Sequence, residues 1–257
     1  EFAKKAHEGQ ERRSGESYFC HVACTAYSIA TINMDATVII AGLLHDAIED
    51  AGISPKIIEK EFGETVRSLV EGVTKLGTLK YRGVERHVES LRKFFIAVAD
   101  DIRVLIIKLA DRMHNIQTLE YIPREKQKRI ALETLEIHAR LADRFGMSKW
   151  KSILEDGAFP YAYPEEYEKM SAIIKTKKIT DEKNAKKIYR SIQKELAENN
   201  LKDARVDYRI KNLYSLWKKL KRKKMEADKV YDILAVRVIV KSIEDCYRAL
   251  GIIHKHW

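Results

Sequence analysis

Histidine and aspartate residues stand at positions where folded helices could bring them together around a metal ion. His45 and Asp46 are adjacent near the end of an apolar stretch, and Glu49 and Asp50 follow one helical turn later. Three carboxylates at the end of an apolar helix are costly to desolvate unless something binds them. One pair could hold a divalent cation while the other accepts a proton from a water molecule or orients that water.

Two further segments strengthen this interpretation, because an adjacent His-Asp pair alone often occurs by chance. His21 begins a predicted helix after a glycine turn, and Asp111 directly follows the apolar run 106–110. Two histidines and two aspartates from three helices form a mixed nitrogen and oxygen set that suits Mn²⁺, Fe²⁺ or Zn²⁺. Asn115 and Thr118 lie four and seven residues after Asp111, on the same helical face, and should point at the same cavity.

Helices joined by short polar turns are predicted for most of the first 160 residues, because apolar residues recur at three- and four-residue spacing. The helix that carries His45 should begin at Asp35 as N-cap, continue to Ala51 and end at Gly52. Further helices are predicted over 55–62, 64–73, 85–99, 103–121 and 124–145.

A domain boundary is predicted around residues 159–164, where aromatic and proline content rises. Basic helices are expected over 165–178 and 181–199, followed by a buried strand over 231–240 and a helix over 243–257. The predicted fold class is mainly α: an all-helical bundle, linker helices and the beginning of an α+β domain. The predicted domains are 1–164, 165–200 and 201–257, the last of them truncated because few partner strands are available.

The charge of the chain is concentrated in its C-terminal third. The 257 residues include 48 Lys and Arg against 38 Asp and Glu; residues 1–164 hold 24 of each sign, whereas 165–257 hold 24 basic and 14 acidic side chains. A basic surface favours phosphate-rich partners such as nucleotides or RNA. The composition excludes a disordered or collagen-like chain.

Cysteine content and hydropathy indicate a cytoplasmic protein. Cys20, Cys24 and Cys246 are too few for a disulfide scaffold, and we expect reduced thiols that are buried or half-buried. No run of 18 apolar residues and no signal peptide is present, so membrane association is not expected.

Other candidate residues have ordinary structural explanations. His7, His87, His114 and His138 have no partner that the sequence indicates, and we expect surface or packing positions for them. The basic run 218–224 should be a solvated helix face. Tyr214 and Trp217, at helical spacing, should belong to the core.

The order of these motifs resembles that of the HD-superfamily phosphohydrolases, and longer blocks resemble the hydrolase domain of the RelA/SpoT family. These blocks are RRSGE at 12–16, LLHDAIED at 43–50, GVTKL at 72–76 and KLADRMHN at 108–115. The block YRIKNLYSLWKK at 208–219, the strand 231–240 and DCYRALG at 245–251 resemble the opening of the family's (p)ppGpp synthetase domain. The resemblance covers essentially the whole chain.

The resemblance implies an HD-type helical domain that hydrolyses the 3′-pyrophosphate of (p)ppGpp with Mn²⁺, giving GDP or GTP and pyrophosphate. It implies four manganese ligands: His21, His45, Asp46 and Asp111. It implies that Glu49 and Asp50 are the acidic pair that activates the attacking water. The implied substrate contacts are Arg12, Arg13, Ser14, Lys80, Asn115 and Thr118.

For the C-terminal part, the resemblance implies a nucleotidyltransferase-like domain that transfers pyrophosphate from ATP to GDP or GTP with Mg²⁺. The implied residues are Arg209, Lys211, Ser215 and Lys219 at the ATP phosphates and Asp232 at the magnesium ion. A second acidic residue lies further downstream in the family, so we do not expect synthesis from these residues alone. Ribosome contact is expected only through regions beyond this chain, and direct DNA binding is not expected.

Two other functions stay open at this point. The chain could be an HD phosphohydrolase for another nucleotide, or a regulatory module that binds ppGpp without cleaving it. The intact Glu49 and Asp50 argue against the second function. Turnover of ppGpp, dGTP and cyclic dinucleotides, measured side by side, would identify the substrate.

Overall fold

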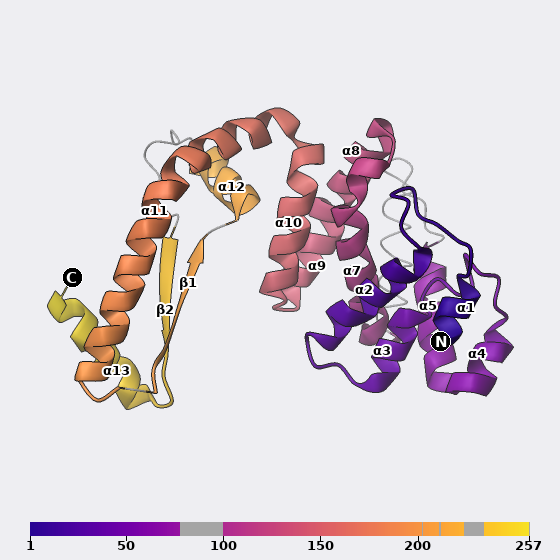
Figure 1. Cartoon of the computed structure of the whole chain (residues 1–257), viewed down its shortest axis with the longest axis horizontal. Helices are drawn as coiled ribbons and strands as arrows, with labels where there is room; N and C mark the ends of the chain where they lie inside the picture. Colours follow the sequence, from indigo (N-terminus) through magenta and orange to yellow (C-terminus); the bar gives the residue numbers. More distant parts are fainter. Residues whose placement is uncertain (78–99, 202, 211, 224–233, 257) are drawn as a thin grey trace. The chain divides into compact units, whose positions relative to one another are not determined.

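The structure, a computed structural model, describes residues 1–77, 100–201, 203–210, 212–223 and 234–256 (Figure 1). Within these ranges most residues are helical, and two strands form one small sheet. The chain divides into two compact units, Glu1–Ala162 and Tyr163–Trp257. The predicted mainly α fold class is confirmed.

The first unit consists of helices linked by short turns. They are α1 (Phe2–Ala6), α2 (Tyr18–Ala30), α3 (Ala36–Leu43), α4 (Pro55–Phe62), α5 (Glu64–Gly77), α7 (Ile102–Gln117), α8 (Arg124–Glu133), α9 (Ala139–Arg144) and α10 (Ser148–Ala162). A 3₁₀ turn, Leu119–Tyr121, follows α7, and a π-helical turn, Thr134–His138, joins α8 to α9. The helix predicted over 124–145 is therefore observed over 124–144, with one π-helical turn inside it. The helix α10 continues through Pro160, where the sequence predicted a loss of helix.

Three helices, α2, α3 and α7, form the framework that carries the candidate site (Figure 1). Each buries an apolar stripe, and the fully buried members include Val22, Ile29, Val38, Ala41, Ile107 and Leu109. Burying one large aliphatic side chain stabilises the fold by about 1.5–3 kcal/mol relative to leaving it exposed. The packing of these stripes fixes the three helices relative to one another.

The helix α3 ends earlier than the sequence predicts. Its N-cap is Asp35, as expected, with the carboxylate accepting a hydrogen bond from the Val38 amide at 3.1 Å. The helix stops at Leu43, however, and residues 44–51 form consecutive turns. Three carboxylates in the next turn would oppose the negative end of the helix dipole. In addition, the His45 ring forms a hydrogen bond to the Gly42 carbonyl oxygen, which accepts no backbone amide of the described residues once the helix has ended.

A glycine allows α2 and α3 to approach closely. A Cβ atom at Gly42 would lie 2.5 Å from Cδ1 of the buried Ile29 and 3.5 Å from Cα of Ala26. We expect Gly42→Ala to lower the free energy of unfolding, because overpacking costs about 1–3 kcal/mol and better helix propensity returns at most about 1 kcal/mol. Urea unfolding measures this loss.

The matched control is Gly251→Ala in the second unit, where an added methyl meets no atom within 4 Å. This control should leave stability unchanged or raise it slightly. A Gly42→Ala protein as stable as the parent would contradict the proposed close packing.

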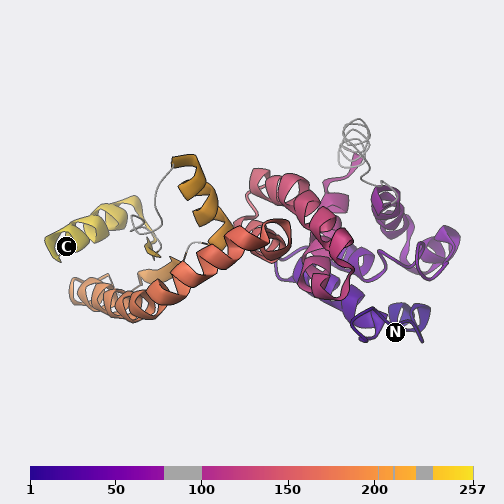
Figure 2. The same ribbon diagram turned by 90° about the horizontal axis from the view of Figure 1, so that it is seen from above.

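The second unit is organised by one long helix, α11 (Pro164–Glu198), in place of the two helices predicted there. It contacts β1 (Arg205–Ile210), β2 (Leu234–Ile239), α12 (Leu213–Lys223) and α13 (Ile243–His256) (Figure 2). The strands are antiparallel, with Arg205 opposite Ile239 and Ile210 opposite Leu234. Residues 231–233 of the predicted strand lie outside the described residues.

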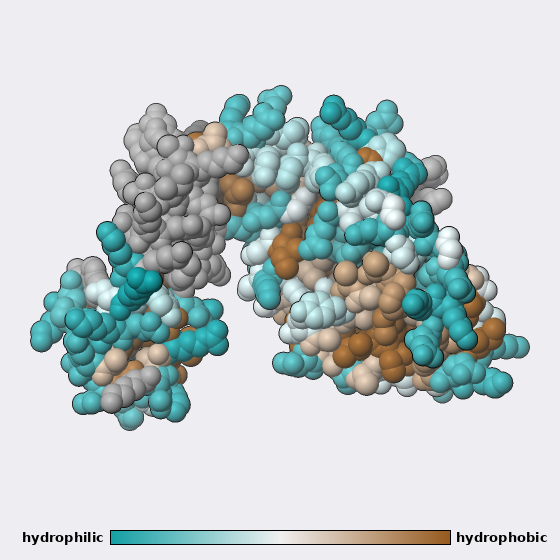
Figure 3. All heavy atoms as spheres, in the orientation of Figure 1, coloured by the Kyte–Doolittle hydropathy of each residue, from teal (hydrophilic) through white to brown (hydrophobic). Residues whose placement is uncertain are grey.

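Hydrophilic residues cover much of the face seen in Figure 3, and apolar side chains gather over α2 and α3. None of the described helices combines the length and apolar character needed to cross a bilayer. All three cysteines are free and exposed, so the prediction of buried thiols was wrong. For Cys20 and Cys24 the reason is helical geometry, because α2 buries His21, Val22 and Thr25 and leaves the opposite face in solvent.

Candidate metal centre

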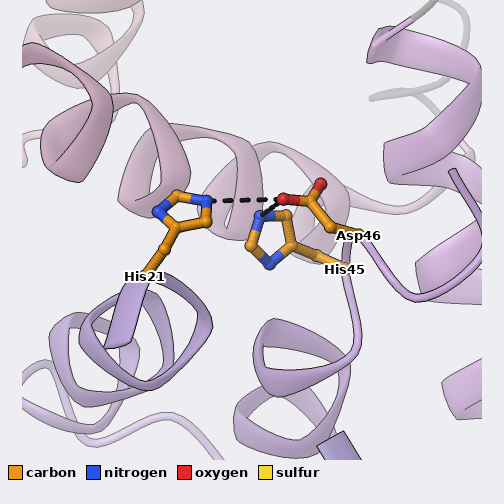
Figure 4. A group of neighbouring side chains, drawn as sticks. All are labelled: His21, His45 and Asp46. Carbon is orange, nitrogen blue, oxygen red and sulfur yellow. Dashed lines mark ion pairs between the residues drawn. The ribbon is translucent and has the colours of Figure 1, made fainter. Parts of the chain in front are cut away.

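Three side chains from two neighbouring segments point toward one another. His21 projects from α2, and His45 and Asp46 lie in the turn that follows α3 (Figure 4). The Oδ2 atom of Asp46 lies 3.4 Å from His21 Nε2 and 3.1 Å from His45 Nε2. One ligand atom from each residue lies within 4.8 Å of the others. This spacing suits a single ion held by all three.

Asp111, on α7, completes the group from a third segment. Its Oδ1 atom lies 3.3 Å from His21 Nε2 and 3.7 Å from His45 Nε2, and the side chain is buried. The structure therefore brings together all four residues that the sequence singled out as a metal set.

The protonation of His45 fits a metal ligand. Its Nδ1 atom lies 2.8 Å from the Gly42 carbonyl oxygen, which can only accept, so the hydrogen is on Nδ1. In the neutral ring the lone pair is then on Nε2, which is buried and faces the carboxylates of Asp46 and Asp111. A lone pair beside two carboxylates is unfavourable unless a cation lies between them. The donor set of two imidazoles and two carboxylates fits a divalent transition-metal ion.

The electrostatics of the group also favour a cation. Burial by itself lowers the pKa of His45, but the charges of Asp46 and Asp111 outweigh burial and raise the pKa to about 10. The carboxylates that would attract a metal ion to Nε2 therefore also attract a proton to it, and the ion would replace that proton. Burial by itself raises the pKa of Asp46, yet the adjacent His45 holds this pKa well below its usual range. Asp111 behaves in the same way, and Lys108, whose Nζ lies 2.8 Å from Asp111 Oδ2, opposes its burial most strongly. Carboxylates that stay ionised while buried attract positive charge.

The acidic pair lies beside this group, in the turn after α3. Tyr18 links Asp50 of this pair to Asp46 of the metal group, because its hydroxyl lies 2.8 Å from Asp46 Oδ2 and 2.5 Å from Asp50 Oδ2. Burial and these two carboxylates raise the pKa of Tyr18, so the phenol keeps its hydrogen. Glu49 is exposed, and partial burial together with Asp50 raises its pKa above the ordinary value. A carboxylate with a raised pKa is a better proton acceptor.

Arg12 reaches the same place from the turn before α2. The turn is closed by a 2.9 Å hydrogen bond from the Gly15 amide to the Arg12 carbonyl, and Gly15 has a φ of 81°. The Arg12 guanidinium donates to His114 Nδ1 at 2.9 Å and to Asn115 Oδ1 at 2.6 Å. Asn115 in turn donates to Asp111 Oδ1 at 2.5 Å. A cationic side chain therefore stands next to the metal group.

Other predicted substrate contacts are less closely tied to this centre. Thr118 is the C-cap of α7, with its hydroxyl 3.3 Å from the His114 carbonyl oxygen. Arg13 is exposed, and the Ser14 hydroxyl lies 3.4 Å from a Glu16 carboxylate oxygen. Lys80 lies outside the described residues.

The residues predicted for ATP lie in the second unit. Ser215 and Lys219 are one turn apart on α12, and Arg209 is in β1. Lys211 and Asp232 lie outside the described residues.

Three residues of the centre were missed by sequence reasoning: Tyr18, Lys108 and His114. Tyr18 stands three residues before His21, and the other two stand three residues before and after Asp111. Helical spacing from a ligand was the signal that could have found them. His114, for which the sequence indicated no partner, is half-buried and contacts Arg12 and His21 through its Nδ1 atom. Burial, His21 and Arg12 lower its pKa to about 4.

Comparison with known families matches both parts of the chain. Residues 1–148 match the family model described as HD domain, and residues 208–257 match the model described as region found in RelA / SpoT proteins. The first match contains the four clustered residues, and the second contains α12, β2, α13 and the last residues of β1.

The sequence relatives are bacterial enzymes of greater length. A guanosine-3′,5′-bis(diphosphate) 3′-pyrophosphohydrolase from Aquifex aeolicus is 45% identical over 99% of this chain and 36% of the relative. A GTP pyrophosphokinase from Myxococcus xanthus is 41% identical over 100% of this chain and 34% of the relative. The chain thus spans about a third of the length of these curated relatives.

A solved structure described as a metazoan ortholog of SpoT that hydrolyses ppGpp is also similar. It has 25% sequence identity and a TM-score of 0.43, and the match covers 61% of this chain and 81% of that one. The sequence matches carry the family assignment.

Proposed function

We propose that the first unit of this chain, which belongs to the HD-domain family, hydrolyses the 3′-pyrophosphate of (p)ppGpp. The chain also carries the region found in RelA and SpoT proteins. The relative from Aquifex aeolicus, which bears the name of this activity, supports the choice of substrate. The observation that carries the proposal is the convergence of His21, His45, Asp46 and Asp111 from three segments. Arg12 beside this group suits a substrate rich in phosphate.

The two histidines and two aspartates would hold the ion, which we propose to be Mn²⁺. Such an ion supplies Lewis-acid stabilisation of the charge that develops on phosphoryl oxygens. Glu49 or Asp50 accepts a proton from the attacking water. The water oxygen bonds to the phosphorus attached to the ribose 3′-oxygen, the bond from that phosphorus to the 3′-oxygen breaks, and the 3′-oxygen takes up a proton. GDP or GTP and pyrophosphate leave.

Substrate contacts complete the proposal. Arg12 and Asn115 stand close enough to the ion site to contact the nucleotide there. Arg13, Ser14 and Thr118 lie in the same turn as Arg12 or at the end of α7 and are proposed to extend this contact. Lys80 is proposed as a further phosphate contact from the resemblance alone.

Pyrophosphate release from ppGpp in the presence of Mn²⁺ tests the proposal. We expect turnover with Mn²⁺ and none after chelation with EDTA, restored by added Mn²⁺. Parallel assays with dGTP and cyclic dinucleotides ask whether another nucleotide is preferred. Binding of ppGpp without turnover in Mn²⁺ would overturn hydrolysis and favour a sensing module.

For residues 201–257 we propose a part in binding the ATP phosphates and Mg²⁺ for pyrophosphate transfer to GDP or GTP. The match of residues 208–257 and the GTP pyrophosphokinase from Myxococcus xanthus support this role. Ser215 and Lys219, one turn apart on α12, are the described candidates for phosphate contact, and α11 is the proposed linker. A cytoplasmic location is proposed with it, since all these substrates are cytoplasmic nucleotides.

A further inference from the structure

Five polar side chains beside the metal group form a closed ring of contacts, which we term the polar ring. Its members are Arg12, His21, Asp111, His114 and Asn115. Arg12 Nη1 lies 2.9 Å from His114 Nδ1, which lies 3.0 Å from His21 Nδ1. His21 Nε2 lies 3.3 Å from Asp111 Oδ1, and Asn115 bridges this oxygen and Arg12 at 2.5 and 2.6 Å. Two proposed metal ligands, His21 and Asp111, thus share the polar ring with two proposed substrate contacts, Arg12 and Asn115.

The contacts of the polar ring determine which imidazole nitrogen of His21 carries the hydrogen. Two ring nitrogens 3.0 Å apart require one hydrogen between them, on either His21 or His114. A guanidinium can only donate, and Arg12 donates to the same Nδ1 atom of His114. That atom is therefore an acceptor, and the hydrogen belongs to His21 Nδ1. The lone pair of His21 is then on Nε2, which faces Asp46 and Asp111.

The two proposed histidine ligands are held in the same tautomer by different means. His45 Nδ1 donates to the backbone carbonyl of Gly42 at 2.8 Å, an acceptor that no side-chain substitution removes. His21 Nδ1 depends on a side chain, His114, whose ring centre is 4.9 Å from its own. The orientation of His21 is therefore the one that mutation can release.

We propose that His114 is a positioning residue that holds His21 with its Nε2 lone pair toward the ion. This inference rests on the proposed function in that it takes the four-residue group for a Mn²⁺ site. Hydrogen-bonded partners of metal-ligating histidines fix ring orientation, and their loss typically weakens metal affinity about 10–100-fold. Through Arg12, the same contact ties the turn before α2 to the ion site.

Calorimetric titration of the whole chain with Mn²⁺ alone tests this role without any nucleotide. We expect His114→Leu to weaken Mn²⁺ binding by about 10–100-fold. His114→Asn should restore most of the affinity, because its Oδ1 atom can accept the hydrogen of His21. His254→Leu, on the exposed face of α13, is the matched control and should bind as the parent does.

The order of the two variants separates positioning from packing. Leucine replaces more of the buried ring than asparagine does, so a packing role predicts better Mn²⁺ binding and a higher melting temperature for His114→Leu than for His114→Asn. Parental Mn²⁺ affinity in His114→Leu would overturn the inference. A parent that binds Mn²⁺ but leaves ppGpp intact would overturn the proposed hydrolysis and leave the role of His114 standing.

Discussion

Replacing Asp46 with alanine is expected to abolish Mn²⁺-dependent release of pyrophosphate from ppGpp. Its Oδ2 atom is within 3.4 Å of both histidine Nε2 atoms, so it is the carboxylate closest to the centre of the group. Losing the ion removes several kcal/mol of stabilisation of the developing phosphoryl charge, which corresponds to about 10³-fold or more in kcat/KM. Pyrophosphate release and calorimetric Mn²⁺ titration should therefore fail together.

Asp143→Ala is the matched control for this substitution. Asp143 is an exposed carboxylate on α9 that pairs with Lys151 at 2.9 Å, and exposed pairs contribute little to stability. Its loss should leave turnover and Mn²⁺ affinity unchanged. Melting temperatures of both variants show whether the fold is retained. Parental activity in Asp46→Ala, with the fold intact, would refute the assigned ion site.

The members of the metal group could be predicted because each is a polar residue at a position that the apolar pattern of its segment predicts to be buried. Asp111 follows an apolar run on α7, and it is buried, as a metal ligand after such a run should be. His21 is buried on the same face of α2 as Val22 and Thr25. Periodicity therefore predicts which side chains face inward, and chemistry then identifies those that are costly there without an ion.

The backbone around the acidic pair could not be predicted from the same pattern. Helical periodicity extends through residues 44–51, yet α3 stops at Leu43. The stop depends on the His45 ring bonding to the Gly42 carbonyl, a contact between side chain and backbone that propensity does not include. One helix-like hydrogen bond, from the Asp50 amide to the Asp46 carbonyl at 2.8 Å, keeps part of the predicted spacing.

Contacts between residues far apart in the sequence also could not be predicted. His114 and Arg12 are 102 positions apart, and only the packing of α7 beside the turn before α2 brings them within 2.9 Å. The pairing of β1 with β2 is likewise nonlocal, and β1 was not predicted as a strand. Spacing along one helix indicates which of its side chains lie near a ligand, but it does not identify the residue from another segment that they contact. That partner is known only when the helices have been placed relative to one another.

Removing the acidic pair should separate chemistry from ion binding. Glu49 is exposed, and among the described residues the Tyr18 hydroxyl is what connects Asp50 to the metal group, so we place neither carboxylate in the ligand set. We expect Glu49→Gln and Asp50→Asn each to lower kcat by about 10²–10⁴-fold, the usual contribution of a proton acceptor, with Mn²⁺ affinity close to that of the parent. Single-turnover pyrophosphate release measures the first quantity and calorimetry the second.

Asp46→Ala provides the decisive comparison, because that variant should lose both kcat and Mn²⁺ affinity. Glu64→Gln, an 80% exposed carboxylate at the start of α5, controls for the removal of one negative charge and should keep parental kcat. If Glu49→Gln and Asp50→Asn lose Mn²⁺ affinity in proportion to rate, the pair belongs to the ion site. If both retain the parental rate, the proton acceptor lies elsewhere, and the turn after α3 would then serve only to hold His45 and Asp46 in place.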